Sequence, residues 1–296
     1  MKHDPSSSQL QGILAIAATA LLWSTSGMLI KLLPWPALTI AGGRSLIASI
    51  VILAITRKIK LNLSFNKVAA AVANSATMLL FIAANKYTTA ANAILLQYVC
   101  PVITAFLAAL MLKERTRIEH WIAVFFVTSG MVIIFFDKLG RGNIVGNLLA
   151  LASAVTFSFV FIFMRKQKDG SPLESFLLSH WITAAIGLGA SLFMPLPVFT
   201  LPAIGAISAL GIFQIGFSSV LFSYGIKRIS AINASLISVI EPVLNPVWVL
   251  LIIGEIPTVY SIAGGAMIII AVAVTSIISA RRDNISVPAA DKKLKE

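Results

Sequence analysis

The sequence predicts an all-α integral membrane protein with ten transmembrane helices, arranged as two inverted repeats of five helices each. Three observations lead to this prediction: the apolar composition, ten long apolar segments, and a similarity between the two halves of the chain. Of the 296 residues, 58% are hydrophobic and 11% are charged, whereas soluble domains carry about 25% charged residues. A soluble fold of this composition would lack the polar side chains that cover a surface.

Ten apolar segments follow one another along the chain. Each is long enough to cross a hydrocarbon layer of about 30 Å, at about 1.5 Å per helical residue. We number them spans 1 to 10, and they cover residues 12–33, 36–56, 67–86, 91–111, 119–136, 146–165, 173–194, 203–224, 232–252 and 258–279. The connections are short, so we expect no soluble domain between spans. Span 1 is too long for a signal peptide and is expected to remain in the membrane.

The distribution of Lys and Arg predicts the orientation of the chain. With the N-terminus inside, 18 of the 23 basic residues fall in cytoplasmic segments, which is the positive-inside pattern. We therefore expect cytoplasmic tails at residues 1–11 and 280–296, in an inner or plasma membrane. The net charge of +12 is expected to meet anionic lipid, and not nucleic acid.

The two halves of the chain are similar in sequence at a nearly constant spacing. Residues 12–24 (GILAIAATALLWS) align with residues 146–158 (GNLLALASAVTFS). Residues 92–102 (NAILLQYVCPV) align in the same way with residues 233–243 (NASLISVIEPV). The spacing increases only from 134 to 141 residues between these two alignments, which a few inserted loop residues explain.

This similarity predicts an internal repeat with residues 12–136 as the first copy and residues 146–279 as the second. Each copy contains five spans, an odd number, so the second copy must enter the membrane from the opposite side. Inverted repeats of this kind are the arrangement from which many secondary transporters are built.

Several stretches resemble a known family. LLWSTSGMLIK (21–31), LLQYVCPVITAFLAALMLKE (95–114) and YGIKRISAINASLISVIEPVLNPVWVLLIIGE (224–255) are similar to the EamA family of the drug/metabolite transporter superfamily, and the similarity covers residues 12–279. The resemblance implies a membrane permease, commonly an exporter of small polar metabolites that works by alternating access around a central cavity. The motifs say little about substrate, because family members that move amino acids, metabolites and drugs share them.

Three ionisable residues lie well inside the predicted spans: Arg44, His180 and Glu241. Such a residue costs roughly 2.5–3.5 kcal/mol at the centre of a membrane helix, so it usually serves a function. The repeat register aligns Arg44 with His180. Arg44 could bind the carboxylate of a zwitterion and Glu241 its amine, or Glu241 could exchange protons. The structural alternative is a protonated Glu241 that joins two helices, a paired Arg44 and a neutral His180.

Further polar residues are expected on the helix face that carries Glu241. At 100° per residue, Ser238, Glu241, Asn245 and Trp248 fall on one side of span 9. We therefore predict that Ser238 and Asn245 take part in substrate binding or coupling together with Glu241.

The repeat register extends this polar face to span 4. Gln97, Cys100 and Thr104 take the positions that Ser238, Glu241 and Asn245 hold in span 9. We add Gln97 and Thr104 to the candidates for substrate binding or coupling. Trp23, at the end of the first aligned stretch, is a further candidate, although a Trp in a membrane helix more often serves packing.

Prolines predict breaks inside spans 4 and 9. Pro101, Pro242 and Pro246 lie within these apolar segments, and each removes one backbone hydrogen bond and leaves a carbonyl without its helical donor. A membrane helix tolerates this where a neighbouring group or a cavity satisfies the carbonyl.

The sequence contains no HExxH, GxSxG or P-loop motif. Cys100 is the only cysteine and the three histidines lie far apart, so we predict no metal site. We expect a protein without enzyme activity or cofactor, whose partners are a small-molecule substrate and membrane lipids; the oligomeric state stays open.

The predicted function is a secondary active transporter that exports small polar metabolites, such as amino acids, by alternating access. The alternatives are a lipid or multidrug flippase, and a non-transporting membrane sensor or assembly protein.

Overall fold

The computed structural model describes residues 5–56, 63–114, 116–136, 143–253, 256 and 258–286. These residues form helices joined by turns, with no β-strand among them. In chain order the helices are α1 (Pro5–Ser24), α2 (Ser26–Lys31), α3 (Ala37–Ile55), α4 (Phe65–Tyr87), α5 (Ala90–Gln97), α6 (Cys100–Leu107), η1 (Ala108–Leu112), α7 (Ile118–Phe135), α8 (Ile144–Arg165), α9 (Pro172–Ser191), α10 (Leu201–Ala209), η2 (Leu210–Phe217), α11 (Ser218–Ile226), α12 (Ala231–Ser238), α13 (Ile240–Ile253) and α14 (Val259–Ser286). The segments η1 and η2 are π-helical.

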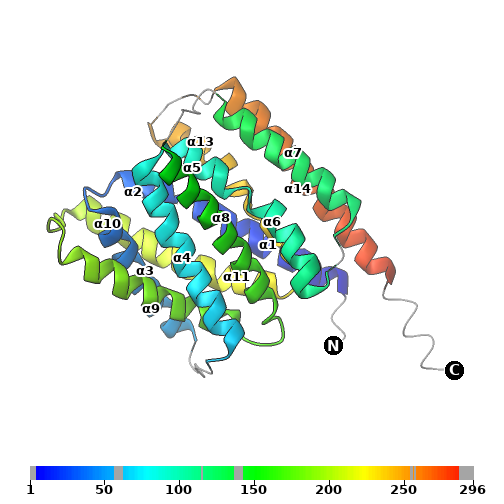
Figure 1. Ribbon diagram of the computed structural model, residues 1–296, viewed down its shortest axis with the longest axis horizontal. Coiled ribbons are helices and arrows are strands. Elements are labelled where there is room, and N and C mark those ends of the chain that lie inside the picture. Colours follow the sequence, from blue (N-terminus) through cyan, green and yellow to red (C-terminus); the bar gives the residue numbers. More distant parts are fainter. Residues whose placement is uncertain are drawn as a thin grey trace.

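These helices confirm the predicted all-α membrane fold. Within the described residues, nine helical stretches are long and apolar enough to cross a membrane, and they correspond to spans 1 to 8 and span 10. Span 9 is present as two shorter helices, α12 and α13. The helices form one bundle in which α1 begins and α14 ends at the same end (Figure 1). We call this the termini end.

The packing between helices follows the internal repeat. α1 of span 1 packs on α11 of span 8, and the corresponding pair, α8 of span 6 and α4 of span 3, also packs together. Among the remaining extensive contacts, α3 with α9 and α7 with α14 join a helix to its own counterpart. The contacts of α4 with α9 and of α3 with η2 form a second corresponding pair. A pseudo-two-fold axis that relates the two copies produces contacts that occur in such corresponding pairs.

Individual residues repeat these contacts at equivalent positions. A Cβ atom added to Gly12 would lie 2.7 Å from Arg228 Cβ and 2.9 Å from a side-chain atom of Ile229. A Cβ atom added to Gly146, the counterpart of Gly12, would lie 2.6 Å from Thr88 N. Thr88 is in turn the counterpart of Ile229 in the 141-residue register. Glycine therefore allows the same close approach of helices in both halves.

Spans 4 and 9 are both broken, and the breaks lie at equivalent positions. In span 4 the helix is interrupted at Tyr98 and Val99, before Pro101, and in span 9 it is interrupted at Val239, before Pro242. The prediction of breaks is confirmed for Pro101 and Pro242 and is wrong for Pro246, through which α13 continues without interruption. The breaks place Tyr98 and the first turn of α13 next to helix ends in the interior of the bundle.

A polar cluster closes the termini end of the bundle. Glu114, which follows η1, accepts a hydrogen bond from Arg165 Nε at 3.0 Å and one from the backbone N–H of Ala231 at 3.0 Å. Arg165 also donates from Nη1 to the carbonyl oxygens of Ile226 (3.1 Å) and Lys227 (2.7 Å). Through these bonds, one carboxylate and one guanidinium connect four spans and cap the first turn of α12.

Replacing Glu114 by Ala should lower the free energy of unfolding by about 1–3 kcal/mol, because it leaves Arg165 and the Ala231 N–H without their acceptor. Thermal unfolding of the detergent-solubilised protein measures this effect. Asp169→Ala is the matched control, since Asp169 is an exposed carboxylate in the loop before α9. Equal melting temperatures for the two variants would show that the cluster contributes nothing to stability.

Candidate functional site

The two helix breaks meet through one hydrogen bond. Glu241 lies in the first turn of α13, and its Oε2 accepts a hydrogen bond from the Tyr98 hydroxyl at 2.6 Å. Tyr98 is 5% exposed, while Glu241 is only partly buried. No described residue donates a hydrogen bond to Oε1 of Glu241, so half of the carboxylate keeps its capacity to accept one.

Arg44 lies on α3 and is held weakly by the protein around it. Its Nη1 donates to Oε1 of Gln214 over a long distance of 3.4 Å. Its Nε is buried and has no acceptor within the described part of the chain. Gln214 belongs to the π-helical segment η2, and π-helical turns inside helices often occur at functional sites.

Arg44 and Glu241 carry opposite charges and form no contact ion pair in the described structure. The described residues show no N···O distance of 4.0 Å or less between the guanidinium and the carboxylate. Each group thus keeps free hydrogen-bonding capacity. A small ligand that carries both charges has complementary partners in this arrangement.

His180 is fixed in the packing between α9 and α11. Its side chain is 0% exposed, and Nε2 lies 3.1 Å from Ser219 Oγ. Ser219 already donates to the carbonyl of Ile215 at 2.7 Å, so the imidazole donates from Nε2. Nδ1 is buried without a partner in the described residues, so a proton there would lack an acceptor. These contacts are those of a neutral histidine.

Two tryptophans join span 1 to the second half of the chain. Trp23 Nε1 donates to Ser218 Oγ at 3.0 Å, and the indole stacks on Phe222 with ring centroids 5.7 Å apart. Trp248 Nε1 donates to Ser24 Oγ at 2.7 Å. Both bonds lie close to the break between α1 and α2 at Thr25, so they hold this broken helix against spans 8 and 9.

The candidates from span 4 and Ser238 make local or packing contacts. Gln97 Nε2 donates to Ser153 Oγ at 2.8 Å, Thr104 Oγ1 lies 3.6 Å from Cys100 Sγ, and Ser238 Oγ donates to the carbonyl of Ala234 at 2.9 Å. The predicted continuous face of span 9 is interrupted, because the break at Val239 separates Ser238 from Glu241. Asn245 lies in α13, but its side chain is outside the described part of the structure.

Two polar residues of this region escaped the sequence analysis: Tyr98 and Gln214. Each lies inside an apolar span, which is the signal that could have identified it, because a buried hydroxyl or amide needs a partner. Tyr98 finds Glu241 and Gln214 finds Arg44. Glu241 and Arg44, the two charged residues discussed above, therefore each have one neutral hydrogen-bonding partner.

Comparisons with known proteins agree with this architecture. The family model described as the EamA-like transporter family matches residues 10–136 and again residues 144–277. A Bacillus subtilis protein described as the uncharacterized transporter YyaM is 26% identical over 211 residues, which cover 67% of this chain and 68% of that protein. An uncharacterized transporter of Archaeoglobus fulgidus is 29% identical over 208 residues, covering 67% and 72% of the two chains.

A solved crystal structure shares the fold. It superimposes with a TM-score of 0.81 and 22% sequence identity, and the match covers 94% of this chain and 98% of the other. Because the match includes nearly all of both chains, the two proteins share the whole helical bundle and not one repeat alone.

Proposed function

Because this chain belongs to the EamA-like transporter family, we propose that this multi-pass membrane transporter is a secondary active exporter of small polar metabolites, with amino acids as the best candidates. It moves them by alternating access. The protein lies in the inner or plasma membrane with both tails in the cytoplasm, so the termini end faces inward, as the excess of basic residues at that end favours.

The observation that carries this proposal is the pair of separated opposite charges, Glu241 and Arg44. Both keep free hydrogen-bonding capacity in the interior of the bundle, where an uncompensated charge is costly. In the proposed complex the amine of the substrate binds Glu241 and its carboxylate binds Arg44, which satisfies both residues. Proton exchange at Glu241 is the second role that the same geometry supports.

The substrate class can be tested directly. The medium of an overexpressing strain is compared with that of a deletion strain for all small metabolites, and the compounds that differ are then tested with the purified protein in proteoliposomes. Accumulation of amino acids in the medium, with counterflow of the same compounds in vesicles, is the expected result. Transport of lipophilic cations or lipids, with no amino acid among the substrates, would contradict the proposal and favour a flippase.

Arg44→Gln should reduce the apparent affinity for an amino acid at least about tenfold, because a charge-assisted hydrogen bond to the carboxylate is lost. The affinity for the corresponding amine without a carboxylate should stay unchanged. Counterflow in proteoliposomes with each compound measures both values, and Arg44→Lys, which keeps the charge, should retain part of the selectivity. Equal losses for amino acid and amine would rule out a carboxylate contact at Arg44.

A further inference from the structure

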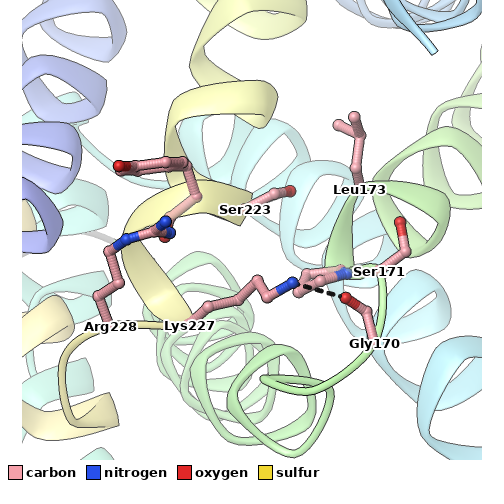
Figure 2. Close-up of a pocket in the computed structure, with 8 residues that line it drawn as sticks. Gly170, Ser171, Leu173, Ser223, Lys227 and Arg228 are labelled. Carbon is pink, nitrogen blue, oxygen red and sulfur yellow. Dashed lines mark hydrogen bonds between the residues drawn. The ribbon is translucent and has the colours of Figure 1, made fainter. Parts of the chain in front are cut away.

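A pocket away from the interior charges opens at the termini end of the bundle, between the start of α9 and the end of α11 (Figure 2). It has a volume of about 270 Å³ and is lined by Gly170, Ser171, Pro172, Leu173, Ser223, Tyr224, Lys227 and Arg228. Two cationic side chains and three hydroxyl-bearing side chains, those of Ser171, Ser223 and Tyr224, thus line one pocket together with apolar atoms. None of these residues takes part in the proposed transport site.

The two cations are held in place by the protein. Lys227 Nζ donates to the carbonyl of Gly170 at 2.8 Å, drawn as a dashed line in Figure 2, and two of its N–H groups remain for another partner. The Arg228 guanidinium stacks on Tyr224, with Cζ 3.3 Å from the ring centroid, and Nη1 donates to the Tyr224 carbonyl at 2.7 Å. Arg228 Nε is buried with no acceptor within the described residues. Both side chains are thus fixed while donors remain unused.

A buried hydroxyl without a partner lines the same pocket. Ser223 is 6% exposed, and its Oγ makes no hydrogen bond in the part of the chain that the structure describes. Figure 2 places it between Arg228 and Leu173. An unsatisfied buried hydroxyl costs roughly as much as a lost hydrogen bond, so its presence in the wall of a pocket points to a ligand that supplies the missing partner.

The start of α9 adds further positive potential. Ser171 is its N-cap residue and makes no side-chain capping bond, and Pro172 occupies the first turn. The N-terminus of a helix attracts anions through its free N–H groups and its dipole. The carboxylate nearest in this turn, Glu174, is paired with Lys67, so it opposes an anion only weakly.

The two cations of this pocket are not repeated in the first half of the chain. In the 141-residue register, Lys227 and Arg228 correspond to Lys86 and Tyr87 at the opposite end of the bundle. The first copy therefore has no pair of adjacent cations at the equivalent position. In the proposed orientation this end lies at the level of the inner headgroups, where anionic lipids are concentrated.

From these observations we propose that the pocket binds a phosphate group. Lys227 and Arg228 provide charge-assisted hydrogen bonds, Ser223 donates its hydroxyl, and the start of α9 contributes its dipole. The apolar surface of Leu173 and Tyr224 receives the carbon atoms next to the phosphate. The phosphate can belong to the headgroup of an anionic lipid or be free in solution, and the two sources are separable by experiment.

The test uses the full-length protein in a neutral detergent, after removal of bound lipid. Its melting temperature is followed during titration with phosphatidylglycerol, inorganic phosphate and, as a phosphate-free lipid, diacylglycerol. The double variant Lys227→Gln/Arg228→Gln should weaken binding at least about tenfold, as expected for the loss of charge-assisted hydrogen bonds. The control Lys168→Gln removes one charge from an exposed residue in the same loop region and should remain within about twofold of the original protein.

Ser223→Ala separates binding from folding. Because the hydroxyl has no partner without ligand, this variant should be at least as stable as the original protein when ligand-free, yet bind phosphate several-fold more weakly. Stabilisation by phosphatidylglycerol but not by inorganic phosphate identifies a lipid site, and the reverse identifies a site for free phosphate. The proposal is overturned if neither ligand binds, if diacylglycerol binds as well as phosphatidylglycerol, or if Lys168→Gln weakens binding as much as the double variant.

Discussion

Glu241→Gln is expected to reduce net transport in proteoliposomes at least about tenfold. Glutamine has nearly the same shape and can still accept the hydrogen bond from Tyr98, but it can neither carry a negative charge nor exchange a proton. Either proposed role of Glu241 requires one of these properties. Loss of a charged hydrogen bond in the membrane interior is worth about 1.5–3 kcal/mol, which corresponds to roughly a tenfold to hundredfold effect.

The two roles of Glu241 give different results in two assays. If the carboxylate carries the coupling proton, Glu241→Gln should abolish transport driven by a pH gradient while substrate counterflow continues. If it binds the substrate amine, both activities should fall together. Tyr98→Phe is the matched variant, because it removes the hydrogen bond and keeps the carboxylate, and its effect should be smaller. A Glu241→Gln protein that works at the original rate across the neutral pH range would eliminate both roles.

Gly187→Ala is expected to lower the free energy of unfolding by about 1–3 kcal/mol, the usual cost of overpacking a close contact. α3 and α9 approach one another through Gly42 and Gly187. A Cβ atom at Gly187 would lie 2.7 Å from Gly42 N and 2.7 Å from the carbonyl oxygen of Leu38. These are backbone atoms, so a side chain cannot turn away to make room, and the two helices must separate.

The same helix provides the control for this prediction. Gly189 lies two residues further on in α9, and a Cβ atom there meets nothing within 4 Å. Gly189→Ala should therefore leave stability unchanged or raise it by up to about 1 kcal/mol through helix propensity. Thermal unfolding in one detergent, together with the monodisperse fraction after gel filtration, compares the two. The close-packing argument fails if both variants melt at the same temperature.

The fold was largely predictable because its determinants are local in the sequence. Apolar length defines each span, and a proline removes one backbone hydrogen bond of a helix, so breaks near Pro101 and Pro242 could be expected from the sequence. Pro246 shows that this signal is incomplete, because α13 continues through it. The repeat could be found because Gly12 and Gly146 serve the same close contact in both halves. Apolar length and prolines are local signals in the sequence, and the repeat is a similarity that recurs at a nearly fixed spacing.

The contacts of the candidate site were less predictable, because they depend on which spans become neighbours. Hydropathy marks Arg44 and Glu241 as exceptional but does not reveal that Gln214 and Tyr98 lie beside them. Helical periodicity placed Ser238 on the face of Glu241, and the break at Val239 invalidates this projection, since the turn angle of 100° per residue holds only within a continuous helix. Gln97 likewise bonds to Ser153 of span 6, a partner that no local pattern indicates.

The hydrogen bond between Tyr98 and Glu241 has no counterpart in the repeat, and under the proposed alternating access this affects the balance between the two forms of the transporter. Two identical inverted halves would produce inward-facing and outward-facing forms of equal energy, since exchanging the halves converts one form into the other. Here the counterparts are Val239 and Cys100, which cannot form the equivalent bond. Wherever this bond breaks in only one of the two forms, the populations become unequal, and a proton or substrate arriving at Glu241 changes their ratio.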